Sequence, residues 1–541
     1  MDQHLVTSTG PGRAQMKRSS AVLLKLALCA GIGLGVPVLP VRAADVPVSE
    51  PIPSTVYEIE LTYIGERTDP TVSFSGPPST AGPLPYRPFQ PILELRASLG
   101  EVRPFGPCRS RTTKSVAGIE LLWSAEGAVR CGQRIELHQS GKPVDLLSYR
   151  MLRIRGRATA PVVVGIEDLT GARREDNRTV GTLRGVFDLE IPLQQIAREV
   201  DLRQVTALVV STEGSDGQVE LEKIDVVQEP PVMRPTGTGF WVWNYRQAAK
   251  APEAMLDTCR AQGCSRVLIQ LPAQSEDEGI WREYAQLLAK VRAVGIEPWA
   301  LDGYPEAIQE PQRLADKITR LLRLVSPGLL SGVQLDIEPY LMPGFLQDEA
   351  QLRRYLSAIG TVKEAIQGRA SLSMVIPFWL AVPTVGGRPL AFAVMDLADE
   401  VAVMSYRTDL DEVQDIADDI LRYGSVSGIP VWLAVETTVL PVEQHVVLRR
   451  ERQSDHAEVL LDRDHRLLRW RPLGEAGAAG LDQEWFRVHR RFTVRPERLS
   501  FAGRSRAQVS SAIKDIQKST SHRSFAGVMI HDLDGFLALA E

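Results

Sequence analysis

The sequence predicts an all-β, jelly-roll-like sandwich followed by an α/β domain, a (β/α)8 TIM barrel. The 541 residues are 44% hydrophobic, which is enough for more than one well-cored domain. Short β-type segments follow one another over residues 92–228. After the Pro- and Gly-rich stretch 229–239, which has the composition of a stiff linker, strands alternate with amphipathic segments over 240–541.

Residues 1–44 have the order of a secretory signal peptide. Basic residues precede an apolar run from Ala21 to Val41, and small residues end it at Ala43 and Ala44. A membrane anchor is the alternative, which the Gly and Pro residues within the run disfavour. A lipid attached at Cys29 is disfavoured by the large residue before it. We therefore expect a periplasmic or secreted protein with no stable membrane span after cleavage.

Charge and cysteine content narrow the class of protein further. Residues 1–44 carry a net charge of +4, so their removal changes the formal charge of −5 to −9, and no long basic cluster remains to bind nucleic acid. Four cysteines remain, which in an oxidising compartment predicts the disulfides Cys108–Cys131 and Cys259–Cys264, with free buried thiols as the alternative. No His lies at ligand spacing beside either pair, and we expect neither a metal nor a cofactor.

The region before the barrel has two parts. Residues 45–91 are rich in Pro and Gly and are predicted to form a tether with one edge strand at 56–61. In the second part, 92–228, no helix-period segment long enough for a βαβ unit separates the β-type runs, which favours a sandwich. These runs are Ile119–Trp123, Met151–Arg157, Pro161–Ile166, Phe187–Ile191, Val205–Val210 and Val219–Val226.

The later half of this region resembles the jelly-roll carbohydrate-binding modules of polysaccharide-degrading enzymes. The resemblance lies in the residue patterns at 147–154, 164–168, 187–193 and 221–227. It implies a module that holds a polymer. A sandwich that only packs against the next domain is the alternative interpretation.

Eight candidate strands follow the linker. They are Phe240–Trp243, Arg266–Leu271, Glu297–Leu301, Gly332–Glu338, Ser371–Phe378, Glu400–Tyr406, Pro430–Glu436 and Ala526–His531. Most gaps between them hold an amphipathic run of helical length, as a (β/α)8 barrel requires. The last gap is long, and we expect a β-rich insertion at about 440–500 that walls the cleft, followed by a helix at Ala507–Gln517.

The fourth strand carries two acids near its end. Val333, Leu335 and Ile337 alternate with Gln334, Asp336 and Glu338, so both acids belong to one face. In such barrels, chemistry takes place at the C-terminal ends of the strands. Two carboxyls that close cannot both ionise at low cost, so one pKa rises and supplies the general acid that glycosidic bond cleavage needs. An ion pair at the barrel rim is the alternative.

The segment 332–338 resembles the fourth-strand D-G-x-D-x-D-x-E signature of the chitinase-type glycoside hydrolases, family 18. Ser331 and Gln334 stand where that family has its first two Asp, while Asp336 and Glu338 match the last two acids. The resemblance implies that Glu338 is the general acid/base and that Asp336 orients a substrate N-acetyl group acting as internal nucleophile.

Two further segments share the resemblance. Met404-Ser405-Tyr406 is similar to the sixth-strand M-x-Y of the family, with Arg407 in place of the following Asp. It implies that Tyr406 hydrogen-bonds the N-acetyl group. Residues 527–534 are similar to the eighth strand of the family, with His531 where a Trp usually floors the sugar site.

A second enzymatic interpretation uses Glu436, at the end of the seventh strand. A Glu after strand four and another after strand seven is the arrangement of the large clan of retaining (β/α)8 glycosidases, with Glu338 as acid/base and Glu436 as nucleophile. That clan typically has Asn before the acid/base, where Ile337 stands here. The Asp336/Glu338 pair is therefore preferred.

Other residues near strand ends are candidates for binding sugar. Aromatic rings that could stack on sugar faces, or simply pack in the core, are Trp241, Trp243, Trp299, Tyr304, Tyr340 and Trp379. Candidates for contacts with sugar hydroxyls are Asp302, Asp532 and Asp534, and His531 is a catalytic partner or a satisfied strand-end histidine. The sequence thus predicts an exported glycoside hydrolase acting on a polysaccharide. The alternatives are a non-catalytic polysaccharide-binding protein and an envelope scaffold.

Overall fold

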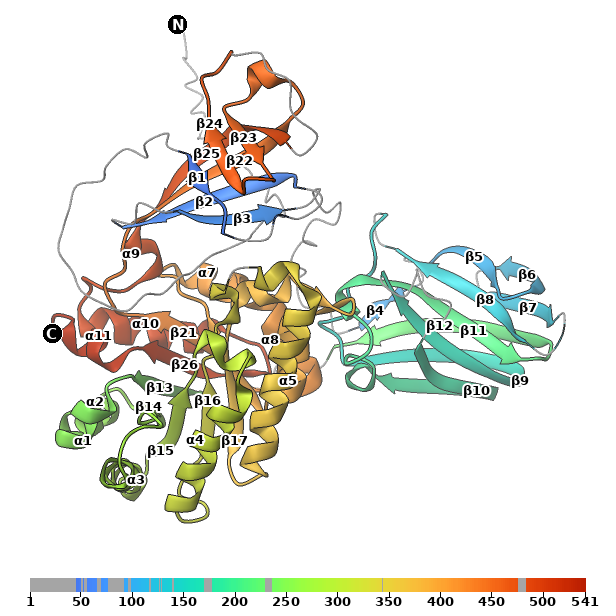
Figure 1. Cartoon of the computed structure of the whole chain (residues 1–541). Helices are drawn as coiled ribbons and strands as arrows, with labels where there is room; N and C mark the ends of the chain where they lie inside the picture. The colour runs from blue at the N-terminus through green and yellow to red at the C-terminus, as the bar shows by residue number, and fades with distance from the viewer. Residues whose placement is uncertain are drawn as a thin grey trace, which may run out of the picture.

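The computed structural model describes residues 45–49, 52, 56–65, 70–75, 92–95, 99–115, 118–125, 127, 129–138, 141–169, 178–228, 236–342, 344–474 and 483–541. The predicted signal peptide and residues 229–235 of the predicted linker lie outside these ranges. Three β-rich parts are visible in Figure 1: a closed barrel, a sheet beyond one end of it, and an all-β domain beside it. Within the described ranges, no helix is long and apolar enough to cross a membrane.

The closed eight-stranded parallel barrel that the sequence predicted is present. Its strands, in order around the barrel, are β13 (Gly237–Val242), β14 (Arg266–Gln270), β15 (Glu297–Asp302), β16 (Gly332–Leu335), β17 (Ser371–Pro377), β20 (Glu400–Met404), β21 (Val431–Glu436) and β26 (Phe525–His531). The first strand begins at Gly237, so the end of the predicted linker belongs to the barrel.

Helices lie in the connections between these strands and after the last of them (Figure 1). They are α1 (Tyr245–Lys250), α2 (Pro252–Ala261), α3 (Glu278–Ala293), α4 (Pro311–Leu324), α5 (Glu349–Ile366), α6 (Leu390–Leu397), α7 (Leu410–Asp415), α8 (Asp418–Ser427), α9 (Pro496–Leu499), α10 (Arg506–Ser519) and α11 (Leu533–Ala538). A short hairpin of β18 (Thr384–Val385) and β19 (Arg388–Pro389) precedes α6. The predicted helix at 507–517 is α10.

The side chains of β16 alternate between its two faces, as predicted. Val333 and Leu335 join the large apolar cluster that also contains buried residues of the helices. Gln334 is 1% exposed, and its amide donates to Ser373 Oγ at 2.9 Å on the neighbouring strand. The strand ends at Leu335, earlier than predicted, so Asp336 and Glu338 lie in the segment that follows the strand.

A seven-stranded antiparallel sheet joins the N-terminal segment to the barrel insertion. Its order is β1 (Val46–Pro47), β24 (Leu467–Trp470), β23 (Val459–Asp462), β25 (Gln483–Val494), β22 (Glu443–Glu451), β2 (Glu58–Ile64) and β3 (Thr71–Ser75). The strand predicted at 56–61 as an edge is therefore an interior one, paired with both β22 and β3. The physical reason is apolar burial: Ile59 and Leu61 are 0% exposed and pack with Val446 and Leu448 of the insertion.

The all-β domain contains nine described strands. They are β4 (Ile92–Glu94), β5 (Leu99–Phe105), β6 (Cys108–Lys114), β7 (Ile119–Ala125), β8 (Arg130–Leu137), β9 (Met151–Asp168), β10 (Arg178–Pro192), β11 (Val205–Glu213) and β12 (Gly217–Val227). Both predicted disulfides are formed, Cys108–Cys131 here and Cys259–Cys264 in the barrel.

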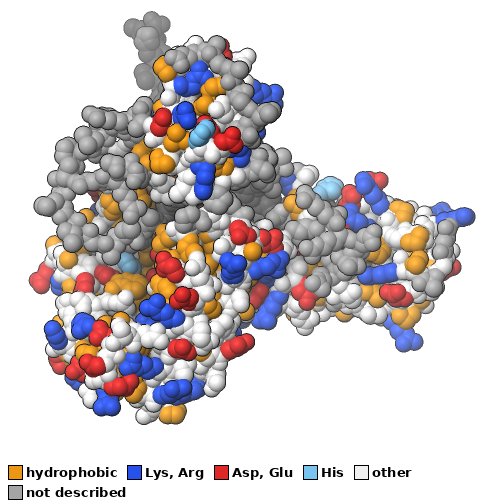
Figure 2. Space-filling view, in the orientation of Figure 1, with side chains coloured by type: hydrophobic (Ala, Val, Ile, Leu, Met, Phe, Trp, Pro, Cys, Tyr) orange, Lys and Arg blue, Asp and Glu red, His pale blue; other side chains and the backbone are white. Residues whose placement is uncertain are grey.

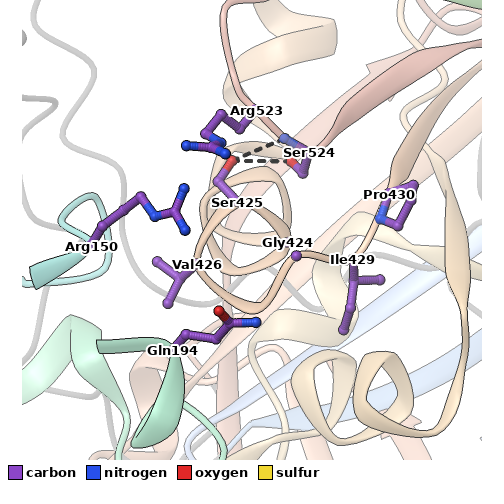
Figure 3. Close-up of a pocket in the computed structure, with 10 residues that line it drawn as sticks. Arg150, Gln194, Gly424, Ser425, Val426, Ile429, Pro430, Arg523 and Ser524 are labelled. Carbon is purple, nitrogen blue, oxygen red and sulfur yellow. Dashed lines mark hydrogen bonds between the residues drawn. The ribbon is translucent and has the colours of Figure 1, made fainter. Parts of the chain in front are cut away.

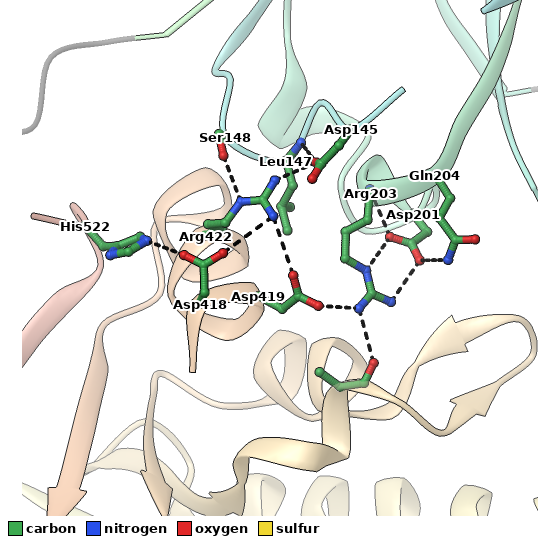
Figure 4. Close-up of polar contacts among 11 residues, drawn as sticks. Asp145, Leu147, Ser148, Asp201, Arg203, Gln204, Asp418, Asp419, Arg422 and His522 are labelled. Atoms are coloured by element: carbon green, nitrogen blue, oxygen red, sulfur yellow. Dashed lines mark hydrogen bonds and ion pairs between the residues drawn. The ribbon is translucent and has the colours of Figure 1, made fainter. Parts of the chain in front are cut away.

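Two arginines attach the all-β domain to the barrel (Figure 4). Arg422 of α8 donates to Ser148 Oγ at 2.7 Å and forms an ion pair with Asp145, and both charged side chains are about 15% exposed or less. Arg203 of the all-β domain forms an ion pair with Asp419 of α8 at 2.8 Å. The interface is thus held by charges that each domain contributes to the other.

Candidate active site

Asp336 and Glu338 lie just past the C-terminal end of β16. The Asp336 amide donates to the Asp302 carbonyl at 2.9 Å, which continues the contact between β15 and β16 beyond the strand itself. Asp336 Oδ1 is shielded from solvent and has no hydrogen-bond partner among the described residues. The predicted pair of acids is therefore held at the end of the barrel where chemistry is expected.

Burial controls the protonation of this pair. It raises the pKa of Asp336 to about 6. It also raises the pKa of Glu338 to about 8, and the charge of Asp336 adds to that rise. The two groups titrate together, so the pair keeps a proton to higher pH than a free carboxyl does.

Tyr340 fixes the orientation of Glu338. Its hydroxyl donates a hydrogen bond to Glu338 Oε1, which favours the charged carboxylate and so lowers the pKa of Glu338 against the effect of burial. The Tyr340 ring packs edge-on against Trp379 with 4.9 Å between centroids. Trp379 is 4% exposed, so in this structure it supports Tyr340 and presents little surface to a ligand.

His531 lies at the end of β26 between two partners. Its Nδ1 is 2.8 Å from Glu436 Oε2, and the Trp243 indole N–H donates to its Nε2 at 3.0 Å. Burial lowers the pKa of His531, but Glu436, Asp532 and Asp336 together raise it above its ordinary value. His531 thus connects the seventh strand of the barrel to the first.

Glu436 is fully buried and its carboxylate is saturated with hydrogen bonds. Oε1 accepts from the Thr437 amide at 2.8 Å, from the Thr438 amide at 2.6 Å and from the Thr438 hydroxyl at 2.8 Å. Oε2 accepts from His531. A carboxylate held by four donors is a poor nucleophile, which favours the Asp336/Glu338 interpretation over direct displacement by Glu436.

Tyr406 lies among the acids. It is 2% exposed, and burial raises the pKa of its hydroxyl well above the ordinary value. The charges of Glu436, Asp336 and Glu338 add to that rise. Tyr406 therefore stays protonated and can act only as a neutral hydrogen-bonding group at the centre of the site.

Comparisons with known proteins give only remote similarities. No protein-family model and no curated protein matches the chain. A solved chitinase from Rhizomucor miehei has 12% identity and a TM-score of 0.33, covering 55% of this chain and 95% of that one. A class V chitinase from Nicotiana tobaccum in complex with NAG4 has 12% identity and a TM-score of 0.31, covering 56% and 95%.

A third structure spans more of the chain. The CBM22-1 and GH10 modules of an endo-1,4-beta-D-xylanase from Clostridium thermocellum, complexed with xylohexaose, have 9% identity and a TM-score of 0.28, covering 82% of this chain and 88% of that one. These similarities are too remote to assign a role to any residue.

Several predicted sugar-binding residues lie elsewhere or have other partners. Trp241 is 1% exposed inside the barrel, where its indole N–H donates to Gln334. Trp299 is 3% exposed and lies toward the N-terminal end of its strand, with the Arg266 guanidinium 4.5 Å above its ring, which fits the alternative of core packing. Asp302 forms a buried ion pair with Lys317.

Of the two predicted sugar-binding acids after β26, Asp532 is a helix N-cap and Asp534 is exposed. The peptide bond between His531 and Asp532 is cis, and Asp532 accepts from the Gly535 amide at 2.7 Å as the N-cap of α11. Burial raises the pKa of Asp532. Asp534 is exposed in the first turn of that helix and is not brought to the acids.

The Tyr304 hydroxyl is buried without a hydrogen-bond partner among the described residues.

The residues that donate hydrogen bonds to Glu436 were not predicted from the sequence. Thr437 and Thr438 were not singled out, although a Glu at a strand end followed by two hydroxyl residues is a pattern that can fold back on the carboxylate. Tyr355 of α5 was also missed. Burial and the charges of Asp336 and Glu338 raise its pKa, so it lies within electrostatic range of the acid pair.

The surface around the site is apolar. Figure 2 shows hydrophobic side chains gathered on the barrel face that looks toward the seven-stranded sheet. Exposed apolar residues on the connections after β16, β17 and β21 are Leu341, Val382 and Val439. Among the described residues, no group of three or more His, Cys, Asp or Glu is arranged to hold a metal ion.

A separate cavity lies at the junction of the barrel and the all-β domain (Figure 3). Arg150 and Gln194 line it from the all-β domain, and Ser425 and Arg523 line it from the barrel. None of the candidate catalytic residues contributes to it. The site at the strand ends is therefore distinct from this junction.

Proposed function

We propose that the protein is an exported glycoside hydrolase that cleaves a polysaccharide, with Glu338 as general acid/base and Asp336 as the assisting carboxylate. Its main support is a pair of half-buried acids just past β16, with Asp336 Oδ1 shielded from solvent, whose pKa values burial raises. Near neutral pH, one group holds a proton that it can give to a leaving oxygen, while its neighbour stays charged. Hydrolysis of a glycosidic bond needs both at once.

The chemistry runs in two steps. Glu338 protonates the glycosidic oxygen as its bond to the anomeric carbon breaks, and the charge that develops on the sugar is stabilised by the Asp336 carboxylate. Glu338 then takes a proton from the water that attacks the anomeric carbon, which restores the acid. If the substrate carries an N-acetyl group, as the resemblance to family 18 implies, its carbonyl oxygen displaces the leaving oxygen that Glu338 protonates, while Asp336 accepts a hydrogen bond from the amide N–H. Water then attacks the anomeric carbon, which frees the carbonyl oxygen, and Glu338 takes the proton of that water.

The apolar rim and Tyr406 fit such a substrate. Leu341 and Val382 are exposed beside the acids' strand end and could contact the apolar faces of sugar rings. Tyr406 is a neutral donor among the acids, suited to a carbonyl or hydroxyl oxygen. We propose Leu341, Val382 and Tyr406 as substrate contacts.

The all-β domain is proposed to position the barrel rather than to stack on sugar. Large hydrophobic residues exposed in its described part are Val129, Leu169 and Val186, and none of them is aromatic. Sugar-binding surfaces usually present aromatic rings. Its two arginine-mediated contacts with α8 instead fit a packing role.

A second candidate is a polysaccharide-binding protein without turnover. Gln334 and His531 favour it, because both replace residues of the family pattern and both are held by internal hydrogen bonds. The test is to incubate the mature protein with N-acetylhexosamine polymers and a broader glycan panel and to analyse released oligosaccharides. Release that is lost in Glu338→Gln supports the hydrolase, whereas binding without release supports the second candidate. N-terminal sequencing of the exported protein tests the signal peptide.

A further inference from the structure

The strongest feature outside the acid pair is a hydrogen-bonded chain of three side chains. Trp243, just after β13, donates to His531 Nε2 at 3.0 Å. His531 at the end of β26 contacts Glu436 Oε2 through Nδ1 at 2.8 Å. His531 belongs to the strand between the other two, so the chain spans three neighbouring strands of the barrel.

Trp243 decides the form of the imidazole. An indole N–H is a donor only, so His531 Nε2 must accept and cannot carry a proton. A neutral imidazole has one N–H, which therefore resides on Nδ1 and donates to Glu436. With both ring nitrogens occupied, His531 has no proton to give to a substrate.

The surroundings of His531 would otherwise favour a charged ring. Glu436 of β21, Asp532 before α11 and Asp336 after β16 all act to raise its pKa, against the effect of burial. Tyr406 faces it from β20 with 5.8 Å between ring centroids, and Trp241 faces it from β13 at 5.5 Å. Glu338 also lies within electrostatic range of the ring. These charges favour the imidazolium, whereas the indole donor opposes it, because an imidazolium carries a proton on Nε2 and has no lone pair there to accept from Trp243.

We propose that Trp243 is a positioning residue that holds His531 as the neutral Nδ1–H tautomer and so keeps a positive charge away from Asp336. An imidazolium beside Asp336 would favour the charged form of Asp336 before substrate binds. It would also neutralise the negative charge of Asp336 that is proposed to stabilise the developing positive charge on the sugar. Asp336 Oδ1, which has no protein partner among the described residues, is instead left for the substrate. This role of Trp243 rests on the proposed function, but its electrostatic part does not require turnover.

The experiment is NMR on the full mature protein with labelled imidazole nitrogens and Asp carboxyl carbons, with signals assigned through His531→Asn and Asp336→Asn. In the parent, His531 should keep the chemical shifts of the neutral Nδ1–H tautomer from about pH 5 to about pH 8. In Trp243→Phe, which keeps an aromatic ring and removes the donor, His531 should titrate within that range. The Asp336 carboxyl midpoint should then fall by roughly one pH unit.

Trp485→Phe is the matched control, since this half-buried Trp lies in the insertion sheet. It should leave both signals as in the parent. A parent His531 that titrates, or that carries its proton on Nε2, overturns the proposal even if the Phe variant does not fold. An Asp336 midpoint unchanged between the parent and Trp243→Phe also overturns it. A protein that releases no sugar but shows the expected shifts contradicts the hydrolase and leaves the role of Trp243 in place.

Discussion

The Tyr340 hydroxyl donates to Glu338 Oε1 from only two residues further along the chain. This contact opposes the rise in the pKa of Glu338 that burial produces. The Tyr340 ring is in turn packed against Trp379. Glu338, the proposed general acid, therefore has its pKa and its orientation influenced by an aromatic residue of its own loop.

Tyr340→Phe should raise the pKa of Glu338, because a hydrogen bond donated to the carboxylate favours its charged form and is lost in the variant. The basic limb of the kcat/KM profile should move to higher pH by roughly half a unit or more. Tyr304→Phe is the control, since that hydroxyl has no hydrogen-bond partner in the described structure. A basic limb that stays in place in Tyr340→Phe would contradict this account of Tyr340.

The pH dependence of the parent should be bell-shaped. Activity should rise as Asp336 loses its proton near pH 6 and fall as Glu338 loses its proton near pH 8. These midpoints belong to the pair rather than to single residues. Initial rates measured at low substrate concentration over the range check the prediction, and a profile that keeps rising above pH 8 would be inconsistent with Glu338 as the acid.

Stability should depend on pH through the same residue. The pKa of Glu338 is about 8 in the folded protein and near 4.5 when unfolded, so between these values the folded state binds the additional proton. Stability from this group is present below about pH 4.5 and is lost as pH rises to about 8. Glu338→Gln should therefore unfold at a higher temperature than the parent at about pH 8, with little difference at about pH 4.5. Equal melting curves at both pH values would argue against a buried, protonated Glu338.

The domain interface should depend on Arg422. Arg422→Met leaves the Asp145 carboxylate, 14% exposed, without its guanidinium partner. We expect a loss of about 2–4 kcal/mol and a melting temperature lower by roughly 3 °C or more, because an unpaired charge remains largely buried. Arg198→Met is the control, since Arg198 is 64% exposed and lies 3.7 Å from Asp396. Calorimetry in which both variants melt like the parent would show that the ion pair does not hold the domains together.

Features that depend on residues close together in the sequence were predicted correctly. The eight barrel strands were visible because apolar alternation and helical spacing arise within each segment, and Gln334 was assigned to the inner face by the same alternation. The disulfides followed from an even number of cysteines. The acid pair was predicted because its two members are neighbours in sequence.

Long-range partners were not predictable in this way. The β2–β22 pairing, with Leu61 opposite Val446, joins residues 385 positions apart in the chain, and neither segment alone indicates its partner. Trp299 and Trp243 both occur in aromatic strands, but one lies within its strand and the other just beyond it, so an error of one or two residues in a strand boundary changes the assignment. The Trp243–His531–Glu436 contacts likewise depend on barrel closure between β13 and β26.

Cleavage by Glu338 is tested by comparing the parent, Glu338→Gln and Glu306→Gln on an N-acetylhexosamine polymer, with released oligosaccharides quantified near neutral pH. Glu306 is an exposed acid in the connection after β15 and serves as the matched control. If Glu338 is the general acid/base, the parent and Glu306→Gln should release oligosaccharides, and kcat should be lower by about 10²- to 10⁴-fold in Glu338→Gln. Equal release by the parent and Glu338→Gln, or no release by the parent from any glycan of the wider panel, would contradict it.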